Sequence, residues 1–276
     1  MIKRRTFVIG DIHGGYRGLI QVLKRSGFDY GNDVLISMGD LADGWSETHL
    51  VIEELMKIKN LILIKGNHDQ WMMKALITAL SNDYKGKEIP EDLIKKHYSS
   101  SFYKLSGEGR SWYRHGGLGT EYSYKNNPDL VIPHVEFLEK GLDYYIDDEN
   151  RFFSHSGPDP YETIENTNPA RFYWNREFWE YAVSPTNTHK TFEKHLKDYS
   201  EIYIGHTPTL RYEGDQDNTK PINIKNVWNM DTGACFDGKI SMMNIDTKEV
   251  FQSDVVRELY PHEKGRMEYS FHVDNL

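Results

Sequence analysis

Five short segments of this sequence each place a metal-binding or proton-transferring side chain beside a glycine or a turn residue. In chain order they are Gly10-Asp11-Ile12-His13-Gly14, Gly39-Asp40-Leu41-Ala42-Asp43, Gly66-Asn67-His68-Asp69, His155-Ser156-Gly157 and Gly205-His206-Thr207. A single D-x-H or G-N-H string arises easily by chance, but five such segments in one chain do not. Together they predict a site for two divalent metal ions that could hydrolyse a phosphoester.

Hydrolysis of a phosphoester by two metal ions sets requirements that these residue types meet. Two divalent ions about 3.5–4 Å apart can clamp a phosphate, lower the pKa of a bound water to give the attacking hydroxide, and stabilise the leaving oxygen. The pair needs a bridging carboxylate, for which Asp40 is the candidate. The other expected ligands are Asp11 and His13 on one ion, and Asn67, His155 and His206 on the other.

The mixture of ligand types also narrows the choice of metal. Carboxylate, imidazole and amide oxygen suit borderline-hard ions, so we expect two divalent ions, manganese first, with iron or zinc as alternatives. None of the five segments contains a cysteine, which argues against a closed structural zinc site.

Departure of an alcohol in such a reaction requires a group that protonates its oxygen. His68, next to Asn67, is the candidate for this general acid. Asp43 could orient the His68 ring and raise its pKa, as a carboxylate partner does for a catalytic imidazole. Because Asp43 also belongs to an Asp-Gly dipeptide, which is common in ordinary turns, its role depends most on the other segments.

Residues in two of these segments also have a simpler structural explanation. Asp11 and Asn67 could cap helices, and His13 could be a surface residue in a turn. For Asn67 the two roles are compatible. The metal-site interpretation is favoured for the whole set because all five segments end apolar runs in one chain.

The apolar runs before the five segments have the length and composition of buried strands. They cover residues 6–9, 34–37, 61–64, 151–154 and 202–204. Helical spacing at 19–25 and 47–59 gives the first third of the chain a β-α-β-α-β pattern. Ligands gather at the carboxyl ends of strands in such sheets, so the strands should deliver the five segments to one rim.

The strand pattern disappears between residues 75 and 133. This stretch is expected to form a cap beside the site, with helices near 71–80 and 90–97 followed by loops rich in glycine and tyrosine.

The rest of the chain predicts one more helix and a group of strands. The helix is expected at 169–182, opened by Pro169 near its first turn. Alternation at 227–256 predicts strands that close a second sheet. Polar residues at 261–276 are expected to form a C-terminal tail.

The five segments resemble the motifs of the phosphoprotein phosphatase family of the calcineurin-like metallophosphoesterases, in particular its bacterial and phage members. Those proteins carry GDIHG, GD-x-x-D-x-G, GNH[ED], a histidine followed by small residues, and GHT. The stretch Trp112-Tyr113-Arg114-His115-Gly116-Gly117 with Thr120, and the segment Asp231-Thr232-Gly233, add to the resemblance. It runs from about Phe7 to about Asp246, which is most of the chain.

The resemblance implies both a fold and an activity. The fold would be α/β (α+β), a β-sandwich of two mixed sheets flanked by helices in four layers, αββα, with the dinuclear site at one edge. One such domain would span 1–260, with the cap inserted at about 75–133 and the tail at 261–276. The activity would be that of a metallophosphatase acting on phosphoserine or phosphothreonine in proteins. A symmetrical diadenosine tetraphosphate hydrolase is the alternative, and an inactive metal-binding scaffold is the second alternative.

Two arginine positions bear on how a phosphate would be bound. In the family an arginine that contacts phosphate usually follows the second aspartate of the second motif, whereas here Gly44 follows Asp43. Arg176 matches the position of another phosphate-binding arginine in bacterial members, W-x-R-x-x-F. A guanidinium can hold a phosphate with two parallel hydrogen bonds, so Arg176, with Asn67, is the expected phosphate-binding residue. The missing arginine leaves the substrate class more open than the activity.

Composition fits an enzyme with a core of its own. A chain of 276 residues can bury one large core, and no apolar run approaches the ~20 residues needed to span a bilayer. A net charge of −9 disfavours nucleic acid as the main partner. The single cysteine, Cys235, can form no internal disulfide, which is compatible with a reducing cytoplasm. We therefore expect a cytoplasmic enzyme whose partner is a phosphorylated protein or a small phosphoester, with no membrane contact.

Overall fold

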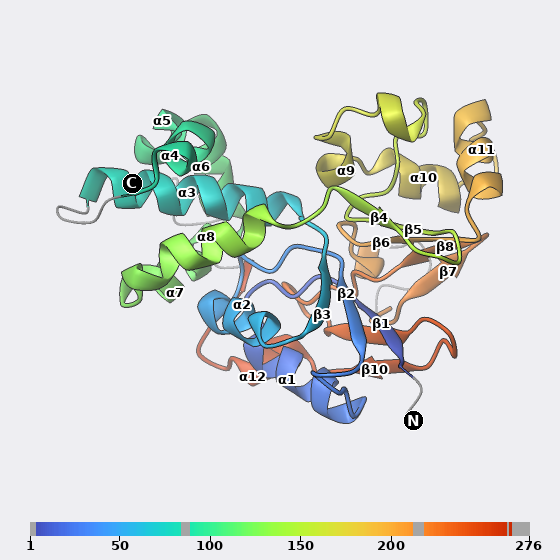
Figure 1. The fold of residues 1–276 in the computed structure, drawn as a ribbon, viewed down its shortest axis with the longest axis horizontal. Helices are drawn as coiled ribbons and strands as arrows, with labels where there is room; N and C mark the ends of the chain where they lie inside the picture. The colour runs from blue at the N-terminus through green and yellow to red at the C-terminus, as the bar shows by residue number, and fades with distance from the viewer. Residues whose placement is uncertain (1–3, 84–88, 212–217, 264, 267–276) are drawn as a thin grey trace.

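The computed structural model of the chain describes residues 4–83, 89–211, 218–263 and 265–266. This part of the chain contains two five-stranded mixed sheets that pack face to face and are flanked by helices (Figure 1). The expected α/β sandwich is confirmed.

The first sheet contains the β-α-β-α-β unit that hydrophobic periodicity predicts. Its strand order is β10-β9-β1-β2-β3. The strands are β1 (Thr6–Ile9), β2 (Val34–Ser37), β3 (Asn60–Leu63), β9 (Ser241–Asn244) and β10 (Val250–Gln252). Strands β1 to β3 are parallel and are joined by α1 (Tyr16–Arg25) and α2 (Thr48–Met56), so they end at the same rim.

The second sheet has the order β4-β5-β6-β8-β7, with β5, β6 and β8 parallel. Its strands are β4 (Tyr144–Ile146), β5 (Arg151–Ser154), β6 (Glu201–Ile204), β7 (Ile222–Ile224) and β8 (Val227–Asn229). The prediction that all strands within 227–256 close this sheet is wrong, because β9 pairs with β1 in the first sheet and β10 pairs with β9. Strand β9 is buried on both faces, with Met242 and Met243 in different cores, so its local pattern does not reveal its partner.

Three hydrophobic cores separate four layers of structure. Successive side chains of a strand point to opposite faces, so Val8 and Ile36 of the first sheet meet Phe153 and Tyr203 of the second. The outer face of the first sheet is covered by α1, α2 and α12 (Val256–Leu259). The outer face of the second is covered by α9 (Arg171–Trp174), α10 (Glu177–Val183) and α11 (Lys190–Asp198). The αββα order is confirmed.

The single helix expected at 169–182 is wrong in one respect, because it is two helices with a break at Asn175. The backbone of Asn175 is extended, with ψ of 126°, and its N–H donates to the Ser156 hydroxyl at 3.1 Å. Its side-chain oxygen accepts the N–H of Glu177 at 2.8 Å and so starts α10. Asparagine competes well for such local hydrogen bonds, and the break turns Arg176 toward the rim of the sheets.

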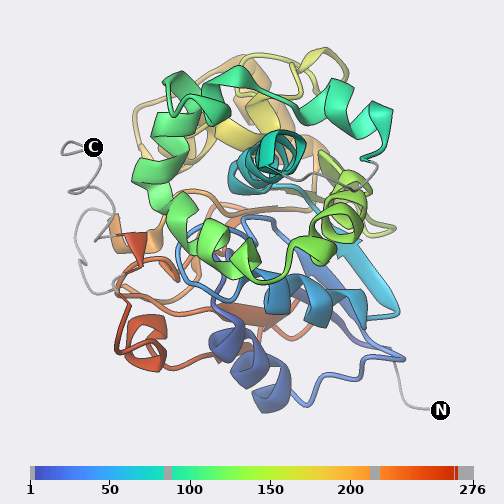
Figure 2. The ribbon, with the colours of Figure 1, turned by 90° about the vertical axis from the view of Figure 1, so that its left-hand side faces the viewer.

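Between β3 and β4 the described chain is helical. The helices are α3 (Asn67–Asp83), α4 (Glu91–His97), α5 (Ser100–Tyr103), α6 (Gly107–Trp112), the π-helical turn η1 (Tyr113–Gly117), α7 (Leu118–Lys125), the 3₁₀ turn η2 (Pro128–Leu130) and α8 (Val131–Glu139). Figure 2 shows them arranged around α3, which is seen end-on.

The loops expected in the later part of this stretch are therefore short helices. Phe102 and Trp112 pack on Trp71 and Ala75 of α3, and this burial outweighs the weak helix propensity of the glycines.

The ends of the predicted domain and cap, 1–260 and 75–133, remain predictions. Part of the expected tail lies against the fold: Glu263 accepts hydrogen bonds from the N–H and hydroxyl of Ser46, at 3.0 and 2.6 Å. Residues 267–276 of that tail lie outside the described residues. Among the helices described, none has the length and apolar character needed to cross a membrane.

Candidate metal centre and its pocket

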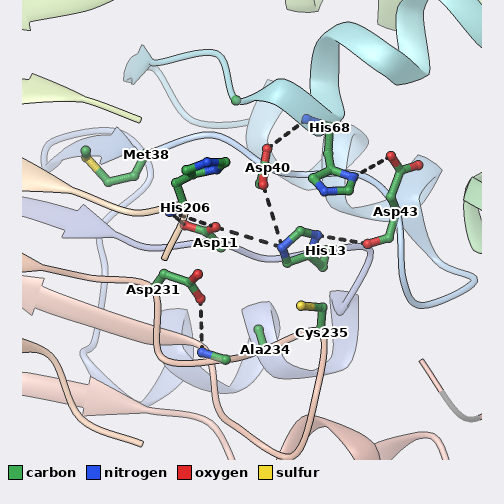
Figure 3. Close-up of polar contacts among 12 residues, drawn as sticks. Asp11, His13, Met38, Asp40, Asp43, His68, His206, Asp231, Ala234 and Cys235 are labelled. Atoms are coloured by element: carbon green, nitrogen blue, oxygen red, sulfur yellow. Dashed lines mark hydrogen bonds and ion pairs between the residues drawn. The ribbon is translucent and has the colours of Figure 1, made fainter. Parts of the chain in front are cut away.

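The rims of the two sheets bring all five motif segments together. Asp11 follows β1, Asp40 follows β2, and Asn67 and His68 open α3 after β3; His155 follows β5 and His206 follows β6. In two groups the ligand atoms lie within 4.8 Å of one another: Asp11, His13 and Asp40 form one, and Asp40, His155 and His206 form the other. Asp40 is common to both groups, which is the position expected of a bridge (Figure 3).

The imidazoles of His13 and His155 present the same ring nitrogen, Nε2, to the carboxylate of Asp40. Nδ1 of His155 and Nδ1 of His13 each donate to a backbone carbonyl, at 2.8 Å. Their Nε2 atoms are thereby directed inward, 3.3 Å and 3.7 Å from Asp40 Oδ2. The Asn67 side-chain oxygen lies 3.1 Å from Nε2 of His155. A carbonyl on the outer nitrogen fixes the tautomer that a metal-binding histidine needs.

Two features of the cluster show that cations would fit it. The Nε2 atom of His206 is buried and has no hydrogen-bond partner among the described residues. The pKa of Asp11 is raised well above its ordinary value, first by burial and then by the nearby carboxylates of Asp231 and Asp40. Bound divalent cations would satisfy the nitrogen and offset the carboxylate charge, and these oxygen and nitrogen donors suit manganese, iron or zinc.

Asp40 itself is held in the ionised form. Burial acts to raise its pKa, but the imidazoles of His155 and His68 outweigh burial and lower the pKa well below its ordinary value. The backbone N–H of His68 also donates to Asp40 Oδ1 at 2.9 Å. A buried carboxylate held ionised is a strong ligand for a divalent ion.

Backbone strain concentrates at this rim. His13, Asp40, Asp43 and His206 have φ angles of 51°, 51°, 68° and 68°, in the left-handed region that residues other than glycine rarely adopt. Such strain persists only where the surrounding structure holds it, and it is concentrated at functional sites.

Two of the motif glycines are required by close approach. A Cβ atom at Gly66 would lie 2.1 Å from Asp40 Oδ1, and one at Gly205 would lie 2.2 Å from Asp11 Oδ1. Any side chain at either position would displace a candidate ligand.

Asp69 ties the loops after β2 and β3 together, a role that its sequence position alone did not suggest. Its Oδ2 accepts the N–H groups of Gly66 and Asp40, at 2.8 and 3.0 Å, and its Oδ1 accepts the N–H of Leu41 at 2.8 Å. The signal that could have found it is the fourth position of Gly66-Asn67-His68-Asp69, where an acidic residue is part of the motif.

His68 and Asp43 form a buried pair beside the candidate ligands. His68 Nδ1 lies 2.7 Å from Asp43 Oδ2. The other carboxylate oxygen accepts hydrogen bonds from Trp112 Nε1 at 2.8 Å and from the Thr120 hydroxyl at 2.7 Å. Two helices, α6 and α7, therefore hold Asp43 in place. Because Asp43 occupies Nδ1 of His68, the Nε2 atom of that ring is left to face the pocket.

Burial shifts both members of this pair toward their neutral forms. It raises the pKa of Asp43 to about 7, against the hydrogen bonds from Thr120 and Trp112. It also lowers the pKa of His68 well below its ordinary value; the negative charge of Asp40 opposes this, and the positive charge of Arg266 adds to it. The sequence predicts that Asp43 raises the pKa of His68, but the pKa is lowered because burial is the larger effect.

A cavity of about 290 Å³ lies directly over the cluster. Its lining includes the candidate residues His13, Asp40, Asn67, His68, Arg176 and His206. Arg176 Nη1 donates to the His206 carbonyl at 2.9 Å and to the Thr207 hydroxyl at 3.0 Å. The structure therefore brings every predicted site residue to this cavity or directly beneath it.

The cavity also has lining residues that sequence reasoning did not select. Trp71 and Trp174 meet with ring centroids 4.7 Å apart, and Arg266 enters from near the end of the described chain. Helical spacing places Trp71 one turn after Asn67 and could have indicated it. No local pattern marks Arg266.

Comparison with known proteins finds a matching family and relatives that are named as phosphatases. Residues 4–225 match the family described as calcineurin-like phosphoesterase. The chain is 33% identical to serine/threonine-protein phosphatase 1 of Salmonella typhimurium (strain LT2), over 88% of this chain and 92% of that protein. It is 32% identical to the symmetrical bis(5'-nucleosyl)-tetraphosphatase of Buchnera aphidicola subsp. Baizongia pistaciae, over 89% of this chain and 96% of that protein.

Solved structures share the fold at lower identity. A chain named provisionally as a diadenosine tetraphosphatase matches with a TM-score of 0.55 and 16% identity, over 91% of this chain and 93% of that chain. The cold-active protein-tyrosine phosphatase of a Shewanella species matches with a TM-score of 0.52 and 14% identity, over 91% and 80%.

Proposed function

The chain belongs to the calcineurin-like phosphoesterase family, and from that premise we propose that it is a metal-dependent phosphatase of phosphomonoesters, with phosphoserine and phosphothreonine in proteins as its first candidate substrates. The observation that carries the proposal is the Asp43–His68 pair, 2.7 Å apart, beside two carboxylate–imidazole clusters in one cavity. Ester hydrolysis needs a proton donor next to the site that binds phosphate. A site that only bound metal would not need this pair.

The proposed ligands divide as the geometry groups them. Asp11, His13 and Asp40 would hold one divalent ion, and Asp40, Asn67, His155 and His206 the other. Two bound ions would supply a water of lowered pKa and positive charge for the phosphate oxygens. Manganese is the first prediction for the metal, with iron or zinc as alternatives.

The residues of the chain would position the ester and move the proton. His68, oriented by Asp43 through Nδ1, would donate a proton from Nε2 to the leaving alkoxide. Burial disfavours the imidazolium form of His68, but a phosphate dianion beside the ring favours it. Arg176 would donate two hydrogen bonds to phosphate oxygens. The Asn67 amide, whose oxygen is directed to His155, would donate from its nitrogen.

Hydrolysis of symmetrical diadenosine tetraphosphate is the second candidate function. The relative from Buchnera carries the corresponding name, and Trp174, 41% exposed at the cavity, offers a ring on which an adenine base could stack. An inactive scaffold that binds metal without turnover is the third reading. A phosphorylated protein or small phosphoester as partner, the absence of nucleic acid and membrane partners, and a cytoplasmic location remain predictions.

The test is phosphate release from p-nitrophenyl phosphate and a phosphothreonine peptide by metal-stripped protein, with and without added manganese. We expect manganese-dependent turnover that Asp40→Asn abolishes and that His68→Asn reduces about 10²- to 10⁴-fold. Chromatography of the nucleotide products, with peptide and diadenosine tetraphosphate in competition, separates the two substrates. Metal-loaded protein that turns over none of these substrates would support the inactive scaffold, and unchanged turnover in His68→Asn would exclude the acid role.

A further inference from the structure

A second guanidinium reaches the cavity from near the end of the described chain. Arg266 lines the cavity together with His13 and His68. Its backbone N–H donates to the Cys235 carbonyl at 3.4 Å, and its Nη1 donates to Cys235 Sγ at 3.6 Å. The guanidinium also lies over the Phe236 ring, 5.3 Å from the centroid. Arg266 is thus held against the loop that follows β8.

Among the residues that the structure describes, these partners leave most of the hydrogen-bonding capacity of Arg266 unused. A guanidinium carries five N–H donors, and Arg266 is half-buried, where a charged group normally has an opposite charge as its partner. Within the ranges 4–83, 89–211, 218–263 and 265–266, no carboxylate forms an ion pair with Arg266. Its guanidinium contacts the Cys235 thiol and the Phe236 ring, and the charges of Asp40 and Asp43 act on it from beyond ion-pair distance. An anion in the cavity would supply the missing partner.

The turn after Asp43 explains why the guanidinium comes from another segment. Gly44 has a φ angle of 138°, and a Cβ atom there would lie 3.0 Å from the His13 carbonyl oxygen, so an arginine at this position would be strained. Gly44 N–H donates to the Gly116 carbonyl at 3.0 Å. A Cβ atom at Gly116 would lie 2.9 Å from Cγ of Arg266. Gly116 therefore leaves the space that the Arg266 side chain occupies.

We propose that Arg266 is a phosphate-binding residue. It binds the substrate phosphate from the side of the Asp43 turn, while Arg176 binds it from the side of the loop that follows β6. The proposal rests on the proposed phosphatase function for the identity of the anion. Two planar guanidiniums on separate elements can each present paired N–H donors to different phosphate oxygens. Arg266, near the end of the described chain, then completes the binding site.

Binding of inorganic phosphate to the full-length manganese-loaded protein tests this without requiring turnover. Isothermal titration would compare wild type with Arg266→Ala, Arg266→Lys and Arg176→Ala. The matched control is Arg257→Ala, which removes the same charge from α12, where Arg257 forms an exposed ion pair with Asp237. Metal content and thermal unfolding are measured on each variant.

We expect Arg266→Ala to weaken phosphate binding about 10- to 100-fold, in line with hydrogen bonds to a charged group, with bound metal unchanged. Arg266→Lys should recover part of the loss, because lysine keeps the charge without the paired donors. Phosphate binding in Arg266→Ala as tight as in Arg257→Ala would overturn the proposal. The proposal would also be overturned if Arg266→Ala lost phosphate binding only to the extent that it lost bound metal or folded protein, while Arg266→Lys bound phosphate like wild type. If wild type binds phosphate but hydrolyses no ester, the proposed activity fails while the Arg266 comparison remains decisive.

Discussion

The floor and the wall of the cavity are built in different ways. The floor is the set of candidate metal ligands: Asp11, His13, Asp40, Asn67, His155 and His206. None of them is more than 6% exposed. The wall is the set of side chains around the opening: Trp71, His115, Trp174, Arg176, Phe236 and Arg266. His115, Trp174 and Arg176 are exposed, and they come from separate helical elements.

The difference indicates which part controls which property. Floor residues are fixed by the backbone of neighbouring loops, as Asp40 is by the N–H of His68, so their arrangement is set once the two sheets pack. Wall residues extend from elements outside the sheets and can vary without disturbing the floor. We infer that the floor determines the type of reaction and the wall selects the ester. Variants of the two regions should therefore affect different kinetic constants.

Among variants that keep every candidate ligand and His68, the largest effect is expected from Asp69→Asn, which loosens the floor. The amide nitrogen would replace an oxygen that accepts backbone N–H groups, leaving at least one buried donor unpaired at Gly66, Asp40 or Leu41. The free energy of unfolding should fall by about 1–3 kcal/mol. Misplacement of Asp40 by a fraction of an ångström up to 1 Å should lower kcat about 100-fold. Steady-state kinetics and denaturant unfolding measure the two effects.

Asp33→Asn is the matched control, since Asp33 is also buried and accepts backbone N–H groups, from Arg5 and Asp29 at 3.2 and 2.9 Å. It should lose stability but not kcat. Burial acts to raise the pKa of Asp33, but the Arg5 guanidinium and the two N–H groups lower it below its ordinary value. Its stabilisation is therefore present above about pH 4 and is lost as pH falls through the lowered pKa, so wild type and Asp33→Asn should converge toward acid pH. Equal kcat losses in both aspartate variants would contradict the special position of Asp69.

A smaller effect is expected from Trp112→Phe, at the junction of floor and wall. The substitution removes the indole N–H that donates to Asp43 Oδ1 at 2.8 Å and keeps the Thr120 hydroxyl on the same oxygen. Poorer orientation of Asp43 and hence of His68 should lower kcat about tenfold, roughly the value of one hydrogen bond to a carboxylate, with KM unchanged. Trp228→Phe, which removes an indole hydrogen bond to Glu201 in the second sheet, should leave both constants unchanged. A change in KM without a change in kcat would place Trp112 with the wall.

The floor could be predicted from the sequence because each ligand lies beside its own strand. Apolar runs located β1, β2 and β5 at their observed residues, and β3 and β6 within one residue. Parallel strands that end at one rim then bring Asp11, Asp40 and His155 together. The information is local, and it concerns one strand end at a time.

Other features could not be predicted because they depend on contacts between distant segments. The sheet to which β9 belongs is decided by pairing with β1, and the helix break at Asn175 depends on Ser156. Arg266 lies at the cavity with its Cγ against Gly116, 150 residues earlier in the chain. These are contacts of packing, which a single sequence does not record.

The smallest effect is expected from Trp174→Ala, which changes only the wall. The exposed Trp174 ring contacts Trp71 at 4.7 Å between centroids and can stack on an aromatic leaving group. Such a contact is worth about 0.5–1.5 kcal/mol, so KM for p-nitrophenyl phosphate should rise about two- to tenfold while kcat stays the same. KM for glycerol 2-phosphate, which has no ring, should not change, and Trp174→Phe should keep most of the wild-type preference. An equal rise of KM for both esters would mean that Trp174 shapes the opening without choosing the ester, and selection would then belong to the charged part of the wall.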